Sequence, residues 1–552
     1  MKLKNYAEGS WVEHKGYGFE QYNAITGDLI STASSEGLDY EAMTDYARRI
    51  GGKALRSMTF YERGFMLKKL ALHLDSLKKK YYQISYLSGA TKSDSWVDID
   101  GGIGTLFTYA SLRRQLGNQR FYVDGDTAKI SKNNTFVGQH IMSPKQGVVV
   151  HINAFNFPIW GMLEKLSANL IAGVPAIVKP SEITSYLTQA MVEDIIASGI
   201  VPEGAIQLDC GKGHGILDTL GSQDLVTFTG SATTGRMLKS LPHIIENSIP
   251  FNMEADSLNA AILGEDSAPG TANFDIFIKE VRREMTTKAG QKCTAIRRIM
   301  VPENYLEDVQ IALGKSLAQT TIGDPANEKV RMGAIVNKSQ VDVVRNRVLE
   351  MSQKTPIVFG DLDKFEVIGA DANKGFFLPP ILMLNENPLI NTDSHDIECF
   401  GPVSTLMPYN GIEEAITLAK MGKGSLVSTI ATSDVHIATE YAIEAASYHG
   451  RILILNEASA PESTGHGSPM PQLMHGGPGR AGGGEELGGI GSVKHYLQRT
   501  ALQGHPSMLT EITQRYQYGG VYKEKDVHPF RKYFEDLEIG DTVITAKHTV
   551  TV

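Results

Sequence analysis

The chain has 552 residues, of which 42% are hydrophobic and 21% charged, and this ordinary globular composition predicts about three or four structural units. Its 53 basic and 62 acidic side chains give a formal charge of −9, which excludes a general attraction to nucleic acid or to an anionic membrane. The N-terminus lacks a secretory signal, and no segment has the roughly twenty apolar residues of a membrane span. We therefore expect a soluble, cytoplasmic protein.

The first predicted elements are helices, followed by a parallel sheet. Apolar residues recur at helical spacing over residues 40–77, which predicts a helical N-terminal section. From about residue 146, short β-branched runs at 148–152, 176–178 and 224–228 alternate with segments of helical length. This alternation predicts an α/β fold in which a parallel sheet carries helices on its faces.

A second α/β section is predicted after residue 254. Residues 260–263 and 298–301 read as buried strands around the helix that precedes Cys293, so the chemistry is expected between two α/β lobes. Two polar, strand-like pieces lie outside these lobes, at residues 121–141 and 495–497. Either piece could pair with a neighbouring subunit.

Residues 464–489 are strongly enriched in glycine. Glycine carries a large entropic cost of ordering, which favours a mobile surface loop. The alternative is a loop that closes over the substrate entrance.

Cys293 is the leading candidate for a nucleophile. It follows a Gly-Gln-Lys turn, which can present a thiol to solvent, and a reactive thiol needs access together with a lowered pKa or a nearby base. Cys210 and Cys399 lie in apolar surroundings and are expected to be buried. Three scattered cysteines and the absence of CxxC or HExxH spacing argue against a disulfide framework and against a metal site.

Two further residues fit chemistry at a carbonyl group. Asn156 lies between two phenylalanines and before Pro158, and its amide could donate a hydrogen bond to an oxyanion; the alternative is a turn asparagine. Glu254 follows an apolar run, so partial burial is expected to raise its pKa and let it deprotonate water near neutral pH. The alternative for Glu254 is a solvated surface carboxylate.

Polar residues also follow the predicted strands. Lys179 and Glu182 come directly after one strand, at the edge where parallel sheets bind ligands, and both can reach ribose hydroxyls. Gly230 and Ser231 come after another strand and open a helix, so backbone amides can approach a pyrophosphate there. The glycines of 211–215 form neither a Walker motif nor a GxGxxG fingerprint and are interpreted as a turn.

Taken in order, these motifs resemble the aldehyde dehydrogenase superfamily over nearly the whole chain, to about residue 503. They are Phe-Asn-Phe-Pro at 155–158, Val-Lys-Pro-Ser-Glu at 178–182, Phe-Thr-Gly-Ser at 228–231, Glu254, Gly-Gln-Lys-Cys at 290–293 and Glu-Cys-Phe-Gly-Pro-Val at 398–403. The resemblance implies a Rossmann-like cofactor domain, an α/β catalytic domain and a small β oligomerisation domain. The expected boundaries are 1–120 with 146–256 for the dinucleotide-binding domain, 257–480 for the catalytic domain, and 121–145 with 481–510 for the oligomerisation elements.

The resemblance also implies roles for individual residues. Cys293 would attack the aldehyde, Asn156 with the backbone N–H of Cys293 would stabilise the oxyanion, and Glu254 would activate the water that releases a carboxylic acid. The cofactor would be NADP or NAD. The implied cofactor-binding residues are Lys179, Ser181, Glu182, Gly230, Ser231, Glu398 and Phe400. Dimers or larger homo-oligomers are expected.

A closer similarity is to the bifunctional PaaZ-type proteins of phenylacetate degradation, in which an aldehyde dehydrogenase precedes a MaoC-like hydratase. It is carried by residues 475–489, 494–500 and 528–534. The implied substrate is 3-oxo-5,6-dehydrosuberyl-CoA semialdehyde, with NADP⁺. The related CoA-linked semialdehyde dehydrogenase of benzoyl-CoA degradation shares the glycine-rich stretch and is an alternative.

Two features depart from that pattern. Residues 511–552 read as a linker and the start of a truncated MaoC-like hydratase domain, so hydratase activity is expected to be absent. Glu182 favours a free ribose 2′-hydroxyl and therefore NAD, whereas the resemblance implies NADP. Two rival functions also remain: a CoA-acylating dehydrogenase, which has less use for Glu254, and a non-catalytic scaffold.

Overall fold

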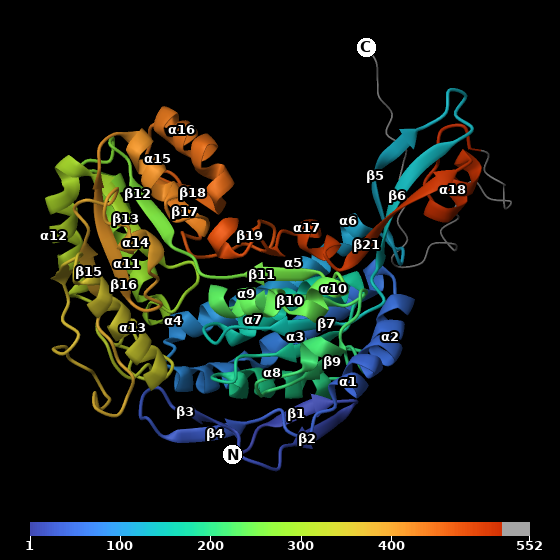
Figure 1. Ribbon diagram of the computed structural model, residues 1–552, viewed down its shortest axis with the longest axis horizontal. Coiled ribbons are helices and arrows are strands. Elements are labelled where there is room, and N and C mark those ends of the chain that lie inside the picture. Colours follow the sequence, from blue (N-terminus) through green and yellow to red (C-terminus); the bar gives the residue numbers. More distant parts are fainter. Residues whose placement is uncertain (521–552) are drawn as a thin grey trace.

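The computed structural model describes residues 1–520, which form two large sheets and one projecting arm (Figure 1). Each large sheet has seven strands, and the arm contains a sheet of three strands. Residues 521–552, which hold most of the expected start of a hydratase domain, lie outside the described residues.

The first sheet supplies one wall of the site. Its central strands pair in parallel, and β1 with β2 adds an antiparallel edge. The order along the sheet is β11 (Phe251–Glu254), β10 (Leu225–Thr229), β7 (Val149–Ile152), β8 (Ala176–Lys179), β9 (Ile206–Leu208), β1 (Lys4–Ala7) and β2 (Ser10–Glu13). The chain runs outward from β7 through β8 to β9 and then returns to the other side of β7 as β10. Ligands of open α/β sheets bind at the carboxyl ends of strands beside such a reversal.

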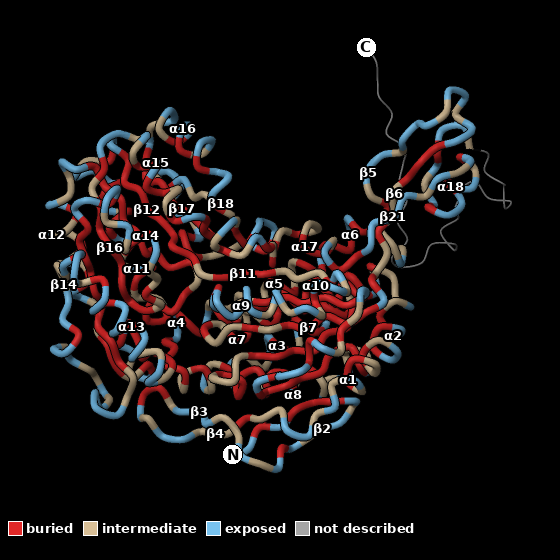
Figure 2. Tube along the Cα trace, in the orientation of Figure 1, coloured by how far each residue is buried: buried red, intermediate tan, exposed pale blue. Residues whose placement is uncertain are grey.

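Helices cover the first sheet and bury its apolar strands, as the red core of Figure 2 shows. They are α1 (Tyr40–Tyr46), α2 (Gly52–Ser57), α3 (Phe60–Ser85), α5 (Gly101–Ser111), α7 (Pro158–Ala172), α8 (Ser185–Ala197), α9 (Ala232–Lys239) and α10 (Pro242–Glu246). The predicted helical section and the three predicted strands of this unit are confirmed.

Helix α7 places the motif around Asn156. Pro158 occupies its first turn, where a missing N–H costs nothing, and Gly173 ends the helix in the left-handed conformation that residues other than glycine rarely adopt. Nearly every side chain of α7 is buried against the sheet. The turn before the helix is therefore held in one position.

The longest helix, α3, has 26 residues and begins at a capping box in which Thr59 and Glu62 satisfy each other's backbone N–H groups. Its many charged residues are typical of a helix at a protein surface. Within residues 1–520, no helix combines the length and the apolar character that crossing a membrane requires.

The second sheet carries the other wall of the site. Its strands follow the order β14 (Ile357–Phe359), β15 (Ile381–Leu384), β16 (Val403–Tyr409), β13 (Ile296–Pro302), β12 (Asn259–Leu263), β17 (Ser425–Ala431) and β18 (His449–Leu455). All pairs are parallel except β14 with β15. The main covering helices are α11 (Ala272–Thr286), α12 (Leu306–Leu317), α13 (Lys338–Met351), α15 (Ile412–Lys420) and α16 (Val435–Ala445). The predicted strands at 260–263 and 298–301 are confirmed as parts of β12 and β13.

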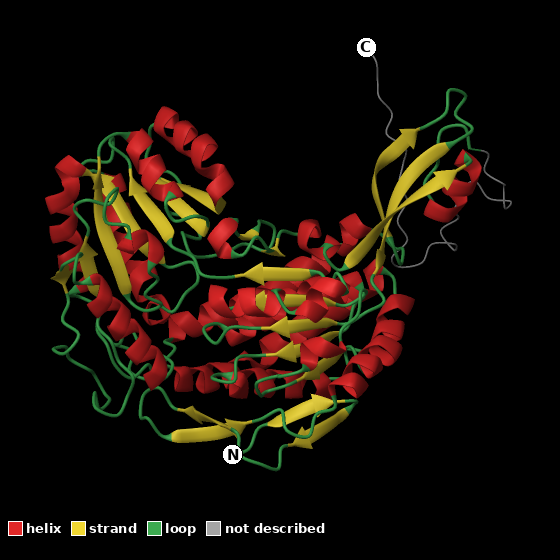
Figure 3. Cartoon of the chain, viewed as in Figure 1, coloured by secondary structure: helices red, strands yellow, loops and turns green. Residues whose placement is uncertain are grey.

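The arm joins the two polar pieces predicted as strands. Strand β6 (Val137–Pro144) pairs antiparallel with β5 (Tyr122–Lys129) on one side and with β21 (Leu497–Gly504) on the other, and α18 (Pro506–Thr513) packs beside them (Figure 3). The residues of the range 481–510 that precede β21 do not all belong to the arm. Leu487 and Val493, within the range expected to serve oligomerisation, join the core of the first unit.

Four short strands near the N-terminus were missed by the sequence analysis. Strands β1 and β2 extend the first sheet, and β3 (Phe19–Tyr22) pairs with β4 (Leu29–Ala33) as a separate hairpin. Ala24 and Ile25, in the turn of that hairpin, pack in a hydrophobic cluster of the second unit. The N-terminal segment therefore contacts both units.

Candidate active site

A cavity of about 520 Å³ lies where the two units meet. Its walls come from α5, the turn after β7, α7, the ends of β10 and β11, the turn before β13 and the glycine-rich segment. The three residues predicted to carry the chemistry, Asn156, Glu254 and Cys293, all line this cavity.

Asn156 reaches the cavity from the turn between β7 and α7. Its side chain is buried, and Phe157 and Trp160 line the cavity beside it. Thr184 donates a hydrogen bond to the backbone carbonyl of Phe155 at 3.0 Å, which fixes the turn from its other side. A side-chain amide held in this way can donate to an oxygen atom in the cavity.

The turn before Cys293 has an uncommon backbone conformation. Lys288, Ala289 and Gly290 have φ angles of +53°, +52° and +67°. A Cβ atom on Gly290 would overlap the backbone carbonyl of Gly401, so this position requires glycine on steric grounds as well as on torsional ones. The turn delivers Cys293 to the cavity with its side chain partly exposed.

Neighbouring residues hold this turn. The backbone N–H of Lys288 donates to Oδ1 of Asp94 at 2.7 Å, and its Nζ donates to Oγ of Ser88 at 2.6 Å. After the turn, Nδ2 of Asn259 donates to the carbonyl of Cys293 at 2.8 Å. These contacts offset the torsional strain, which costs of order 1–3 kcal/mol per residue.

Glu254 lies at the carboxyl end of β11 with its side chain almost fully buried. Nε2 of His475 lies 3.1 Å from its Oε2. The sulfur of Cys293, a carboxylate oxygen of Glu254 and a ring nitrogen of His475 all lie within 4.8 Å of one another. A base, a thiol and an imidazole thus meet at one point of the cavity wall.

The predicted cofactor residues of the first sheet lie at the carboxyl ends of β8 and β10. Nζ of Lys179 lies 3.4 Å from a carboxylate oxygen of Glu182, and Ser181 stands between them in the chain. Ser231, directly after Gly230, accepts a hydrogen bond from the backbone N–H of Thr234 and so caps α9. Because β10 and β8 lie on either side of β7 and run parallel to it, these groups lie together at the carboxyl ends of the strands.

Glu398 and Phe400 approach this region from the second unit. The ring of Phe400 packs edge-on against Phe155 at a centroid distance of 5.8 Å. Arg297 lies 3.7 Å from Oε1 of Glu398, and within residues 1–520 this buried oxygen accepts no hydrogen bond of ordinary geometry. Burial raises the pKa of Glu398 to about 7. An acceptor left without a partner in this way fits a ligand hydroxyl group.

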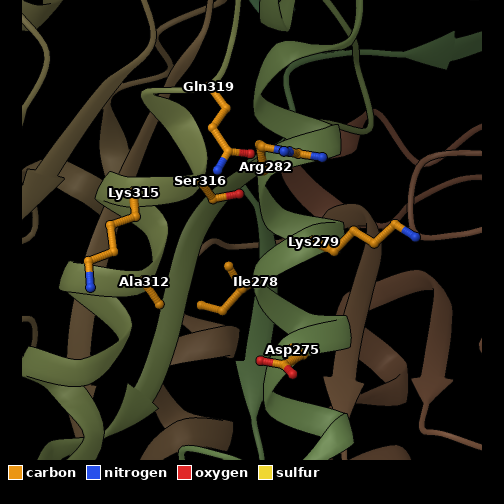
Figure 4. Close-up of a pocket in the computed structure, with 8 residues that line it drawn as sticks. All are labelled: Asp275, Ile278, Lys279, Arg282, Ala312, Lys315, Ser316 and Gln319. Atoms are coloured by element: carbon orange, nitrogen blue, oxygen red, sulfur yellow. The ribbon is translucent and has the colours of Figure 1, made fainter.

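A second hollow of about 320 Å³ lies between α11 and α12 (Figure 4). Lys279, Arg282 and Lys315 line it. None of the residues predicted to react or to bind the cofactor lies there, so the cavity at Cys293 is the candidate active site.

Comparison with known proteins identifies the family of the chain. The model of the aldehyde dehydrogenase family matches residues 11–501. The chain belongs to this family. A 3,4-dehydroadipyl-CoA semialdehyde dehydrogenase from Aromatoleum evansii is 40% identical over 479 residues, covering 87% of this chain and 93% of its own.

Two further matches differ in coverage. The protein MaoC from Klebsiella aerogenes is 49% identical over 221 residues, which are 40% of this chain and 64% of that protein. An aldehyde dehydrogenase from Bacillus cereus, solved with NAD⁺, superposes with a TM-score of 0.78 at 23% identity, covering 92% of this chain and 97% of that one. The fold is therefore that of an aldehyde dehydrogenase, as predicted.

The pKa of Glu254 differs from the prediction for this aldehyde dehydrogenase. Burial alone would raise it, but the positive charges of His475 and Lys165 outweigh burial and hold it below its ordinary value. Conversely, although burial opposes it, Glu254 raises the pKa of His475. Burial and then the Glu254 charge raise the pKa of Cys293. These shifts favour a protonated thiol beside a charged pair of Glu254 and His475.

Three buried charges near the site escaped the sequence analysis. Nζ of Lys165 lies 3.4 Å from carboxylate oxygens of both Glu164 and Glu486 and donates to Oγ1 of Thr229 at 2.7 Å. The signal was present in the sequence, because Glu164 and Lys165 are the charged residues of an otherwise uncharged helix. His475 lies in a glycine-rich stretch, and its contact with Glu254 depends on the tertiary fold.

The glycine-rich segment is part of the cavity wall. Ser463, Thr464 and residues 467–471 line the cavity, and His475 starts β19 (His475–Gly476), which pairs with β20 (Glu485–Leu487). His466 and His475 are buried. The segment is thus part of the cavity wall, which argues against a mobile loop confined to the surface.

Replacing His475 is expected to change the pH profile. With His475→Gln or His475→Phe, the charge beside Glu254 is lost, burial dominates, and the pKa of Glu254 rises. Activity that needs the carboxylate is lost as the pH falls through this pKa, so the acid limb of kcat/KM should move to higher pH by at least about one unit. The measurement is the pH profile of aldehyde oxidation in buffer with EDTA.

The control is His466→Gln. The ring of His466 lies in the same segment but bonds Oγ1 of Thr429. The acid limb of the kcat/KM profile of His466→Gln should match that of the unmodified enzyme. An unshifted limb in both His475 variants would show that the imidazole does not control the carboxylate.

Replacing Gly290 with alanine is expected to displace Cys293. The Cβ would meet the carbonyl of Gly401 at a positive φ, so we expect the free energy of unfolding to fall by about 1–3 kcal/mol and kcat to fall at least about tenfold. Denaturant titration and steady-state kinetics measure the two effects. Gly411→Ala is the matched control, because Gly411 also has a positive φ but open space around its Cβ position. Gly411→Ala should lose stability without losing kcat. An equal loss of kcat in Gly290→Ala and Gly411→Ala would refute the steric argument.

Proposed function

We propose that the protein oxidises a CoA-linked semialdehyde to a carboxylic acid, with NAD or NADP, through a thioester on Cys293 that water hydrolyses. The observation that carries this proposal is the meeting of Cys293, Glu254 and Asn156 in one cavity. A nucleophile, a base and an oxyanion donor are the three groups that such a reaction needs.

The thiol requires a base, because its pKa is raised. Glu254 is ionised and near enough to accept the proton of Cys293. The resulting thiolate then attacks the aldehyde carbon. The Asn156 amide and the backbone N–H of Cys293 donate to the oxygen of the tetrahedral adduct. Glu254 passes the thiol proton on to solvent, and after oxidation leaves a thioester, the carboxylate so regenerated deprotonates the attacking water.

The residues present fit a dinucleotide. Gly230 brings the backbone close at the carboxyl end of β10, and Lys179, Ser181 and Glu182 offer polar groups at β8. Among the described residues, Oε1 of Glu398 accepts no hydrogen bond, although Arg297 lies 3.7 Å away. Bound there, the nicotinamide would supply the hydride acceptor. Lys179 partly neutralises Glu182, so both NAD and NADP remain candidates.

The substrate class follows from the cavity and the relatives. Gly104 and Gly161 line the cavity, and a Cβ on either would meet no other atom within 4 Å. That space suits a long acyl chain. We assign 3-oxo-5,6-dehydrosuberyl-CoA semialdehyde as substrate on the resemblance to the PaaZ-type proteins carried by residues 475–489 and 494–500. The partial match to a protein MaoC fits that relation but names no substrate. The 40% identity with a 3,4-dehydroadipyl-CoA semialdehyde dehydrogenase favours that compound as the second candidate.

The arm of β5, β6 and β21 is the proposed contact between subunits of a dimer or larger assembly. Its strands project beyond the first unit, on the side away from the second, and carry largely exposed residues in β5 and β21.

The deciding experiment compares CoA-linked and free semialdehydes with each cofactor, in the presence and absence of free CoA. We expect a higher kcat/KM for the CoA-linked compounds and no requirement for free CoA. Formation of NAD(P)H that depends on free CoA would instead identify an acylating dehydrogenase.

Replacing Glu254 with glutamine should lower kcat by about 10²–10⁴-fold, the usual contribution of a general base. Free CoA should not restore the rate. Cys293→Ser is the companion variant and should abolish the first turnover in a stopped-flow trace of NAD(P)H formation. A Glu254→Gln enzyme with normal kcat would remove the carboxylate from the mechanism.

Replacing Gly104 with leucine should separate long from short substrates. The fold has room at this position of α5, but a leucine side chain would enter the cavity. We expect kcat/KM to fall at least about tenfold for CoA-linked semialdehydes and to change little for a short free aldehyde, since losing space mainly excludes bulk. Gly104→Ala is the size control. A uniform loss for all substrates would contradict this position of the acyl chain.

A further inference from the structure

Three side chains at the cavity wall have the chemistry and spacing of a zinc site. Sγ of Cys293, a carboxylate oxygen of Glu254 and a ring nitrogen of His475 lie within 4.8 Å of one another, and the nitrogen–oxygen separation is 3.1 Å. Zinc binds thiolate at about 2.3 Å and imidazole or carboxylate at about 2.0–2.2 Å in tetrahedral geometry. Those bond lengths place neighbouring donors roughly 3.3–3.6 Å apart. Small side-chain rotations would therefore bring all three donors onto one ion.

The surroundings suit a metal with one open position. Glu254 and His475 are buried, whereas Cys293 is partly exposed on the cavity, so an ion can enter from the substrate side. Within residues 1–520, neither oxygen of Glu254 makes a hydrogen bond of ordinary geometry, but Oε2 is paired with His475 at 3.1 Å, so ligation would replace that pairing with bonds from both groups to the metal. Three protein ligands leave the fourth position to water or a substrate oxygen.

We propose that Cys293, Glu254 and His475 bind Zn²⁺ and that zinc is a reversible inhibitor competing with the aldehyde. Binding forms bonds from Zn²⁺ to Sγ, to a carboxylate oxygen and to a ring nitrogen. The proton of the thiol and the proton shared by His475 and Glu254 pass to the buffer. A zinc-bound sulfur cannot attack a carbonyl, and a zinc-bound carboxylate cannot accept a proton.

Inhibition rests on the proposed function, but metal binding does not. We therefore test binding first, on the full-length, untagged chain, with Co²⁺ as a spectroscopic probe for Zn²⁺. We expect one equivalent of Co²⁺ per chain, with a thiolate-to-cobalt charge-transfer band and the intense visible bands of tetrahedral cobalt. One equivalent of Zn²⁺ should remove both.

The variants separate the three ligands from other groups. Cys293→Ser should abolish the charge-transfer band, and His475→Phe should weaken Co²⁺ binding by at least about 100-fold, since loss of a ligand exceeds the roughly 10–100-fold effect of an outer partner. Cys399→Ser and His466→Gln are the matched controls and should leave the cobalt spectrum unchanged. Binding that is absent, or that persists unchanged in both Cys293→Ser and His475→Phe, overturns the proposal. Cys293→Ser keeps the side-chain size, so it remains decisive if His475→Phe does not fold.

Steady-state kinetics tests whether zinc inhibits by competing with the aldehyde. Zinc should raise the apparent KM for the aldehyde without lowering kcat, and EDTA should restore activity fully. Zinc that binds at one equivalent without competing with the aldehyde overturns the inhibitory role. If the chain oxidises no aldehyde, the proposed function fails while the cobalt titration still decides the metal site.

Discussion

Cys293 reaches the cavity because three consecutive residues before it adopt positive φ angles. Lys288, Ala289 and Gly290 reverse the chain between the end of α11 and the start of β13, and Gly290 packs directly on the carbonyl of Gly401. The strain of this turn is supported by Asp94 and Ser88, which belong to the helical layer of the first unit. The nucleophile on one sheet is thus positioned by contacts from the unit that carries the other sheet, and the two must assemble before the site exists.

Electrostatics then determines the state of the groups around that sulfur. Glu254 is buried where an isolated carboxylate would be protonated, yet His475 and Lys165 keep it charged. Lys165 is in turn placed between Glu164 and Glu486. These charges come from β11, α7, β19 and β20, so the base depends on a network that spans several elements rather than on a single partner.

Much of the fold could be predicted from the sequence. The β-branched runs that became β7, β8, β10, β12 and β13 have no competing helical pattern. The missed strands β1–β4 are short and polar: β1 and β2 extend the edge of the first sheet beside β9, whereas β3 and β4 pair with each other as a separate hairpin, so each depends on a neighbouring strand rather than on its own pattern. For the candidate site, Asn156, Glu254 and Cys293 were placed together by motif order. The direction of the Glu254 pKa was wrong, because it depends on His475, which is 221 positions away in the chain.

The chain between the end of β18 in the second unit and α17 (Ile490–Lys494) against the first contains the glycine-rich segment, and it carries His475. This stretch therefore connects the two units as well as lining the cavity. Any hinge motion that widened the gap between the units would pull on this stretch and draw the imidazole from Glu254. The carboxylate would then lose the nearest positive charge that favours its ionised form, so the strength of the base depends on the two units staying together.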